Sequence, residues 1–270
     1  MKTRIIAAAV LLPVLLLLLL VLDKTIGAVV MSFLMAIGSY ELLYRTRLVM
    51  RPRLVIYSAV MAFAITMWSY FGAVHAFFLL MVMVFCMLLF AEMMMDHVKV
   101  RAEMLGLCVL AGLVIPYMLS ALVRIFSDNL GRYLIVIPFI VAFMSDAGAY
   151  FVGMKFGKHK LAPVVSPNKT IEGLLGGFAG AMIGMVIYAI VMMLLRFEVN
   201  FGFALLYGLI GSGAGTFGDL CFSIIKRQTG IKDYGNLIPG HGGVLDRFDS
   251  LVMVAPLVEA LLLLMPVISV

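Results

Sequence analysis

Charged residues are scarce in this sequence. Only 13% of its 270 residues are Asp, Glu, Lys or Arg, whereas 64% are hydrophobic and the mean hydropathy is +1.17. A water-soluble domain is nearer one quarter charged and cannot bury so much apolar surface. The composition therefore excludes a soluble fold and predicts an integral membrane protein. Because backbone groups in lipid must be paired internally, each span is expected to be a helix and the fold class all-α.

Cysteine is also rare, and two nucleotide-binding motifs are missing or misplaced. Cys86, Cys108 and Cys221 are widely spaced within apolar segments, which argues against a disulfide framework or a thiolate metal site. No G-x-x-x-x-G-K-[ST] loop is present, so a P-loop ATPase is disfavoured. The G-x-G-x-x-G match at 213–218 lies inside an apolar span with no preceding strand, so a dinucleotide site is not indicated.

Apolar runs long enough to cross the hydrocarbon core, about 18 to 25 residues, recur along the whole chain. They predict a polytopic helix bundle with about nine membrane-spanning helices. Gly72 marks only a short break between the third and fourth helices, so eight or ten spans remain open. The first run lacks a small-residue cleavage site and is interpreted as a retained helix. The expected spans are 5–22, 25–44, 54–71, 73–91, 104–123, 133–154, 173–195, 201–222 and 251–270.

The basic residues are distributed unevenly between the two sides of these spans. With the N-terminus inside, 16 of the 20 Lys and Arg residues fall on the inner side and 4 on the outer side. The positive-inside rule therefore favours an N-in, C-out topology. Two polar loops, 155–172 and 223–250, then face the cytoplasm from the inner (cytoplasmic) membrane. Topology explains the net charge of +6, and no nucleic-acid partner is expected.

Ionisable residues near membrane depth concentrate in the second half of the chain. Residues 1–130 are expected to form an N-terminal scaffold of membrane helices, and residues 131–270 a C-terminal catalytic region. An ionisable side chain at such depth is costly and indicates function. The acidic residues concerned are Asp146, Asp219, Asp246 and Asp249.

Glycines recur every four residues in two of the expected spans. Gly176, Gly180 and Gly184 form one such series, and Gly211 and Gly215 form another. Small residues at this spacing allow helices to approach closely. The pattern predicts close helix packing, and a homodimer contact through these faces remains an open alternative.

The polar stretch 223–250 begins directly after an acidic residue in the eighth expected span. If the helix continues, Asp219, Ser223 and Lys226 share one face. A carboxylate followed by cations suits a metal-bound polyphosphate, because the acid holds the metal and the cations hold phosphate oxygens. Mg²⁺ commonly uses one or two protein carboxylates, with substrate phosphates and water completing its shell.

A glycine-rich loop follows within the same stretch. Gly242 and Gly243 directly follow His241, so the backbone can approach a ligand closely and expose its amides. Asp246 and Asp249 are three residues apart at the expected start of the last helix and so share a face. Asp246 lies at the inner end of the span adjacent to that of Asp219, so the two are expected to converge on one ion.

These residues resemble the motif of the CDP-diacylglycerol synthases, also called phosphatidate cytidylyltransferases. The motif is long and has many fixed positions, and this sequence shows no departure from it. A second stretch, Ser145-Asp146 followed by Ser166-Pro-Asn168-Lys169-Thr170-Ile-Glu172, is similar to another segment of that family and is expected to be a tight turn leading into a helix. The main motif reads Ser223-x-x-Lys226-Arg227-x4-Lys232-Asp233-x-Gly235-x2-Ile238-Pro239-x-His241-Gly242-Gly243-Val244-x-Asp246-Arg247-Phe248-Asp249.

The resemblance implies nucleotidyl transfer, in which CTP and phosphatidic acid from the lipid bilayer give CDP-diacylglycerol and pyrophosphate. It implies Mg²⁺ as cofactor, and a second metal or a monovalent cation remains open. Asp219 and Asp246 are the expected metal ligands, assisted by Asp249 or Asp146, although Asp146 could equally pair with a lysine. The expected catalytic residues are Asp219, Lys226, His241, Asp246 and Arg247. The expected substrate-binding residues are Asp146, Ser166, Asn168, Lys169, Thr170, Ser223, Arg227, Lys232, Asp233, Gly242, Gly243 and Asp249.

Three other functions compete with this hypothesis. A CTP-dependent lipid kinase would transfer the γ-phosphate to an alcohol, but the Lys-Asp and His-Gly-Gly-x-Asp-Arg-x-Asp spacings argue against it. A transporter would usually contain internal repeats with paired broken helices, and no convincing repeat is found. A CDP-alcohol phosphotransferase would carry a D-G-x-x-A-R run, which is absent from the sequence.

Overall fold

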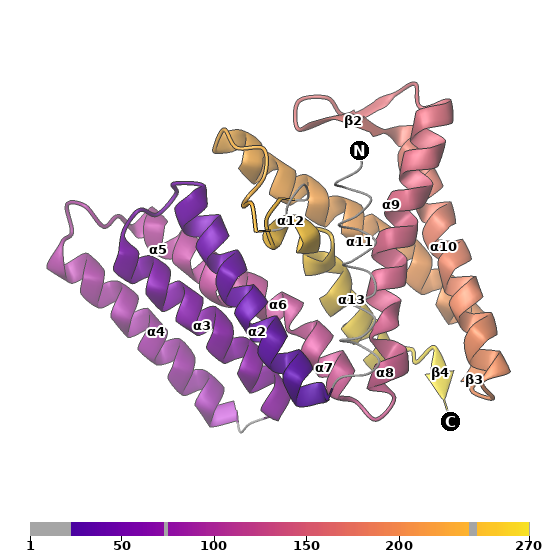
Figure 1. Cartoon of the computed structure of the whole chain (residues 1–270), viewed down its shortest axis with the longest axis horizontal. Helices are drawn as coiled ribbons and strands as arrows, with labels where there is room; N and C mark the ends of the chain where they lie inside the picture. The colour runs from indigo at the N-terminus through magenta and orange to yellow at the C-terminus, as the bar shows by residue number, and fades with distance from the viewer. Residues whose placement is uncertain (1–22, 73–74, 238–241, 270) are drawn as a thin grey trace. The chain divides into compact units, whose positions relative to one another are not determined.

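Helices make up most of both units into which the chain divides (Figure 1). The structure, a computed structural model, describes residues 23–72, 75–237 and 242–269. The first unit comprises the described residues up to Asn129 together with Gln228–Phe248. The second comprises Leu130–Arg227 and the described residues from Asp249 onward. The described residues of the polar stretch from Gln228 to Phe248 thus group with the N-terminal helices, whereas its two ends, up to Arg227 and from Asp249 onward, belong to the second unit.

Long apolar helices build the first unit, in which α3 contacts both α2 and α4 (Figure 1). The Asp23 carboxylate caps α2 by accepting the Thr25 N–H at 2.8 Å, and Pro52 occupies the first turn of α3. Gly72, with φ of 56°, ends α3 in the left-handed conformation that glycine adopts readily. The helices of this unit are α2 (Lys24–Tyr40) with its π-helical extension η1 (Glu41–Arg45), α3 (Pro52–Phe71), α4 (His75–Met95), α5 (Ala102–Val109), the π-helical turn η2 (Leu110–Val114), α6 (Ile115–Leu119), α7 (Ala121–Ser127) and α12 (Leu245–Phe248).

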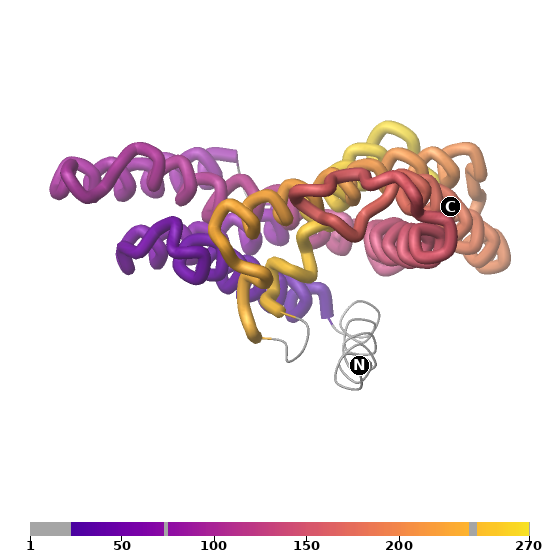
Figure 2. The backbone as a smooth tube through the Cα atoms, turned by 90° about the horizontal axis from the view of Figure 1, so that it is seen from above, coloured from indigo at the N-terminus to yellow at the C-terminus, as the bar shows by residue number. Residues whose placement is uncertain are grey.

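The second unit combines long helices with two short antiparallel strand pairs. β1 pairs with β2 in a hairpin between α9 and α10, and β3 pairs with β4. Figure 2 shows this hairpin reaching over the C-terminal end of α11. The elements are α8 (Gly131–Leu134), α9 (Val136–Phe156), β1 (Lys160–Ala162), β2 (Ser166–Thr170), α10 (Ile171–Leu194), β3 (Glu198–Val199), α11 (Phe201–Gln228), α13 (Leu251–Leu264) and β4 (Ile268–Ser269).

Glycines allow α9 and α10 to pack closely against each other. A Cβ atom at Gly176 would lie 2.7 Å from the Gly148 carbonyl oxygen, and one at Gly184 would lie 2.7 Å from the Met144 side chain. The predicted close packing is therefore confirmed, and its partner is another helix of the same chain. Because this glycine face is already covered by α9, it cannot also serve as the homodimer contact that the spacing left open.

Seven described helices are long and apolar enough to cross a membrane, which confirms a multi-pass helical membrane protein. They correspond to the second through eighth expected spans, and the first, 5–22, lies outside the described residues. The last expected span, 251–270, was too long, because α13 has 14 residues, ends at Leu264 and is followed by β4. The all-α expectation also missed both strand pairs. The count of nine and the N-in orientation stay predictions.

Candidate active site

An acidic residue on α11 forms the first ion pair of the site. Asp219 pairs with Lys169, which β2 carries in the hairpin that precedes α10. Each side chain is only about one quarter exposed, at 28% and 27%. The Ser223 hydroxyl, one helical turn after Asp219, donates to Asp219 Oδ1 at 3.4 Å. The helical face predicted from the sequence is therefore real, and the hairpin adds a cation from a distant part of the chain.

A second ion pair lies in the same unit and is more deeply buried. Lys226 Nζ lies 3.7 Å from Asp249 Oδ2, and the two side chains are 13% and 16% exposed. Burial raises the pKa of Asp249 to about 7, the Asp219 and Asp146 carboxylates add to the rise, and Lys226 opposes it. Asp146, on α9, thus lies close enough to act electrostatically on Asp249. We call Asp146, Lys169, Asp219, Lys226 and Asp249 the carboxylate–lysine cluster.

Gly218 brings Asp249 close to α11. A Cβ atom at this position would lie 2.7 Å from the Asp249 carbonyl oxygen and 3.2 Å from the Met253 side chain. Any larger residue would push the backbone that carries Asp249 away from α11. Gly218 therefore allows the backbone at Asp249 to lie close to α11, which carries Asp219 and Lys226.

Two hydrogen bonds hold the hairpin that carries Lys169, one at the end of β2 and one in the turn between β1 and β2. Thr170 caps α10 by accepting the Gly173 N–H at 3.1 Å. Arg227 Nε donates to the Val165 carbonyl oxygen at 3.2 Å and so ties the hairpin to the end of α11. The expected tight turn at 166–170 was wrong, because these residues form strand β2. Ser166 is partly buried there, and Asn168 is exposed.

The helix α11 continues past the point where the polar stretch begins. It ends at Gln228, so Ser223, Lys226 and Arg227 are helical rather than part of a loop starting at 223. Lys, Arg and Gln are good helix formers, and the two cations lie in the last turn, where they interact favourably with the helix dipole. Ser223, Lys226 and Arg227 therefore occupy fixed helical positions one to two turns after Asp219.

In the first unit, Asp246 is held by the loop in front of it. The residue is 7% exposed, and its Oδ2 accepts the N–H groups of Tyr234 and Gly243 at 2.7 and 3.0 Å. Gly242 has φ of 88°, and a Cβ atom there would lie 2.8 Å from the same oxygen. Two backbone donors thus fix the Asp246 carboxylate between two segments of the polar stretch.

The remaining predicted residues of this stretch differ in their placement. Lys232, Asp233 and Arg247 are exposed, and the backbone N–H of Arg247 bonds the Val244 carbonyl oxygen at 2.9 Å. His241 lies outside the described residues. Asp219 and Asp246 belong to different units, so their convergence on one ion stays a prediction.

Glu41 is a buried acidic residue that the sequence reasoning missed. It is 3% exposed at the start of η1, and its two carboxylate oxygens accept the N–H groups of Val244 and Leu245. The available signal was a lone carboxylate at the C-terminal end of an apolar span, which costs free energy unless it is hydrogen-bonded. Its partners, some 200 residues later in the chain, were not visible from that signal.

The second unit offers ligands that fit Mg²⁺ together with a phosphate-bearing substrate. Within residues 23–72, 75–237 and 242–269, no three His, Cys, Asp or Glu side chains are grouped to hold a metal ion by themselves. Mg²⁺ needs no such group, since one or two carboxylates suffice when substrate phosphates supply further oxygens. Asp219 and Asp249 form such a pair, and the raised pKa of Asp249 reflects buried negative charge that a divalent cation would neutralise.

A model of the cytidylyltransferase family matches residues 2–265. The chain is also similar to proteins named phosphatidate cytidylyltransferase. The one from Staphylococcus haemolyticus is 44% identical over 135 residues, which cover 50% of this chain and 51% of that protein. The one from Staphylococcus aureus strain COL is 44% identical over 133 residues, which cover 49% and 50%.

The matched region spans about half the length of these curated relatives. The family model, in contrast, extends over nearly all of the chain, from the first expected span to the end of α13. The resemblance carried by the Ser223–Asp249 motif is thereby confirmed. The chain belongs to the cytidylyltransferase family.

Proposed function

We propose that the protein is a membrane nucleotidyltransferase that converts CTP and phosphatidic acid to CDP-diacylglycerol and pyrophosphate in phospholipid biosynthesis. The observation that carries this proposal is the carboxylate–lysine cluster, in which two partly buried ion pairs, Lys169–Asp219 and Lys226–Asp249, lie on α11 and neighbouring segments of the second unit. Such a cluster suits a reaction between two polyanions, because it offers both metal ligands and phosphate-binding cations. Family membership and the names of the relatives supply the substrate pair.

The reaction exchanges one phosphoanhydride bond for another. An oxygen of the phosphatidic acid phosphate attacks the α-phosphorus of CTP, and the bond from that phosphorus to the bridging oxygen of pyrophosphate breaks. The attacking oxygen is already ionised at neutral pH, so no strong general base is required. Catalysis then consists mainly of positioning the two phosphates and neutralising their charge.

The cluster residues divide naturally between these two tasks. Asp219 and Asp249 would hold Mg²⁺, which supplies charge neutralisation and orientation to the phosphate oxygens. Lys169 and Lys226 now pair with these same carboxylates, so each is positioned to turn to a phosphate oxygen when its carboxylate binds metal. Arg227 lies on the same helix end and would add a further positive charge.

The other predicted residues would act around this centre. Ser223 would orient Asp219 through its hydrogen bond, and Asp146 would assist the metal site or pair with a lysine. Residues of the hairpin and of the polar stretch would bind nucleotide or lipid phosphate, and His241 would contact phosphate. The residues given these outer roles are Ser166, Asn168, Thr170, Lys232, Asp233, Gly242, Gly243 and Arg247, with Asp246 as a further metal ligand.

The direct test is turnover by the purified protein. With CTP, phosphatidic acid and Mg²⁺, we expect pyrophosphate release that depends on all three components. Replacing CTP by ATP or CMP, or omitting the lipid, should abolish the release. Release that is independent of phosphatidic acid would contradict the proposal and indicate a CTP hydrolase.

Gly218 supplies a sharper prediction, because α11 carries its own control. Gly218→Ala should lower activity by about 10²-fold, since the added Cβ displaces Asp249 and small misplacements in a site are costly. Gly213→Ala, five residues earlier on the same helix, should remain close to wild type, because its Cβ would lie 3.5 Å from the Phe178 ring. Equal activity of the two variants, measured as pyrophosphate release, would contradict the assigned role of Gly218.

We also propose that the site faces the cytoplasm from the inner membrane, on the basis of the positive-inside count. Val164 at the hairpin is 88% exposed and provides a probe of this topology. In a variant lacking the native cysteines, Val164→Cys should react with a membrane-impermeant maleimide in inside-out vesicles and not in intact cells. Labelling in intact cells would reverse the assigned orientation.

If the protein is a homodimer, its contact uses a face other than the α9–α10 glycines.

A further inference from the structure

Glu41 carries a carboxylate in an unusual place for a membrane helix. It starts the π-helical segment η1 at the C-terminal end of the Lys24–Arg45 span and is 3% exposed. A buried carboxylate costs several kcal/mol unless hydrogen bonds offset the loss of water. π-helical turns are rare and occur often at functional sites. A residue of this kind calls for an explanation beyond membrane anchoring.

The hydrogen bonds of Glu41 provide that explanation. Oε1 accepts the Val244 N–H at 3.1 Å, and Oε2 accepts the Leu245 N–H at 3.0 Å. Leu245 is the first residue of the short helix α12 and Val244 directly precedes it, so the carboxylate satisfies amides that have no partner within that helix. Each carboxylate oxygen has its own donor, which fixes both the position and the rotation of the turn.

Two glycines of the polar stretch make room for this carboxylate. A Cβ atom at Gly243 would lie 2.5 Å from both Glu41 oxygens, and one at Gly235 would overlap Oε1. The two glycines also approach each other, because the same Cβ atom at Gly235 would lie 3.1 Å from the Gly243 Cα. Glu41 therefore explains why glycine stands at both positions of the motif.

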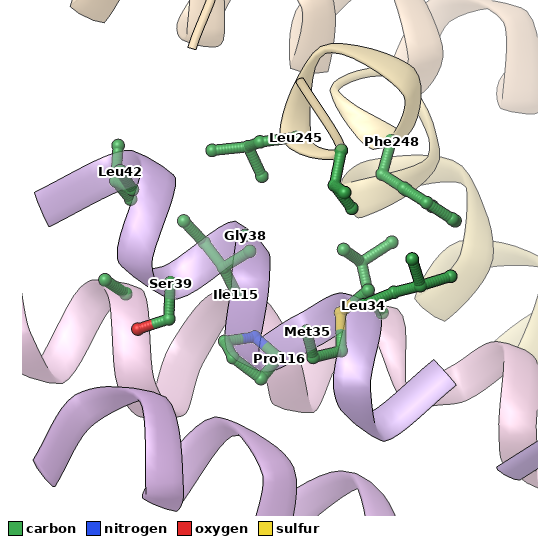
Figure 3. A pocket seen from close by; sticks show the side chains of 12 residues that line it. Leu34, Met35, Gly38, Ser39, Leu42, Ile115, Pro116, Leu245 and Phe248 are labelled. Atoms are coloured by element: carbon green, nitrogen blue, oxygen red, sulfur yellow. The ribbon is translucent and has the colours of Figure 1, made fainter. Parts of the chain in front are cut away.

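Apolar packing supports the same docking. Figure 3 shows Leu245 and Phe248 of α12 at a pocket whose other wall includes Leu34 and Gly38 of α2. Gly38 lies about one helical turn before Glu41. A Cβ atom added at Gly38 would lie 3.8 Å from the Leu245 side chain. The lining is almost wholly apolar, so this pocket serves helix packing rather than nucleotide binding.

Glu41 and Asp246 hold the same turn. Asp246 Oδ2 accepts the N–H of Gly243, and Glu41 accepts the N–H groups of the next two residues. Three consecutive amides are thus held by two carboxylates. We propose that Glu41 is a positioning residue for the polar stretch, which fixes the orientation of Asp246 and hence its contact with the metal–nucleotide substrate. The catalytic part of this proposal rests on the proposed function.

The test compares Glu41→Gln with a carboxylate that has no contact with the loop. Glutamine has nearly the same shape but accepts through one oxygen only, so its NH₂ group would face an amide donor. Glu92→Gln is the matched control, since Glu92 is on α4 in the same unit and bonds Arg53 and Tyr57. The variant Glu41→Asp keeps the charge on a shorter side chain and replaces Glu41→Gln if the latter does not insert into membranes.

The first readout is hydrogen exchange of peptides covering residues 242–249, which needs no turnover. In Glu41→Gln these amides should exchange about tenfold faster or more, because one of them loses its buried acceptor. Glu92→Gln should exchange like wild type. Unchanged exchange in both Glu41 variants would overturn the claim that Glu41 holds the turn.

The second readout is the dependence of turnover on Mg²⁺ and CTP. We expect Glu41→Gln to raise the half-saturating concentrations and lower kcat/KM by about 10- to 100-fold, as for other residues that orient metal ligands. A merely structural role would reduce the folded fraction, and so the apparent kcat, without changing KM. Faster exchange with wild-type Mg²⁺ and CTP dependence would overturn the positioning role. Absence of turnover in wild type would instead overturn the proposed function, and the exchange result distinguishes that failure from one of Glu41.

Discussion

Replacing Asp219 by asparagine is expected to reduce CDP-diacylglycerol formation by about 10²- to 10⁴-fold. The substitution preserves the shape of the side chain and removes the charge that would bind Mg²⁺, an interaction worth several kcal/mol in the transition state. It also leaves Lys169 without its counter-charge, so the lysine is more available to phosphate. The measurement is initial-rate formation of CDP-diacylglycerol by purified variant protein at saturating Mg²⁺.

Folding must be separated from catalysis in this comparison. Glu198→Gln, on the exposed first residue of β3 in the same unit, serves as the carboxylate control and should retain wild-type activity. Size-exclusion behaviour and thermal unfolding of the Asp219 variant in detergent should resemble wild type. A folded Asp219→Asn protein with near-normal turnover would remove Asp219 from the metal site.

Asp246→Asn is expected to have a loss of similar size, and it distinguishes two roles of this side chain. Asn Oδ1 can still accept the N–H groups of Tyr234 and Gly243, so the turn should persist. What the variant loses is the negative charge. If Asp246 binds metal as proposed, activity should fall by about 10²- to 10⁴-fold while the loop remains ordered.

Activity and loop order should therefore be measured on the same Asp246→Asn preparation. Hydrogen exchange of residues 242–249 should stay close to wild type, in contrast to the result expected for Glu41→Gln. Retained activity with retained order would show that Asp246 only supports the loop. The metal ligands would then be sought among the second-unit carboxylates, with Asp219 and Asp249 as the pair.

The long helices and one face of the site follow from the sequence. Apolar run length predicts the helices, because lipid admits no unpaired backbone. The face shared by Asp219 and Ser223 follows from helical geometry, and the two are hydrogen-bonded. Hydropathy does not locate the ends of helices, since it reports how apolar a segment is and not whether its backbone is hydrogen-bonded as a helix. The polar end of α11 is helical to Gln228, whereas apolar residues after Leu264 are not.

The contacts between distant segments could not be predicted in the same way. Lys169 reaches Asp219 only because β1 and β2 form a hairpin, and a five-residue strand containing proline carries little signal. Glu41 was overlooked because the expected division assigned residues 1–130 to a scaffold. Its hydrogen bonds to Val244 and Leu245 connect the N-terminal helices to the polar stretch. The family motif includes the loop residues of this contact, Val244 and Leu245, but it does not extend to Glu41.

The most direct test of the central claim follows the two ends of the CTP triphosphate. Purified protein is incubated with Mg²⁺, an equimolar mixture of phosphatidic acid and a long-chain lipid alcohol, and CTP labelled at either the α- or the γ-phosphate, and the lipid fraction is extracted. Nucleotidyl transfer predicts that α-label enters the lipid as CDP-diacylglycerol and that γ-label leaves in pyrophosphate. Entry of γ-label into lipid, with α-label remaining in soluble CDP, would contradict the account and identify a CTP-dependent lipid kinase.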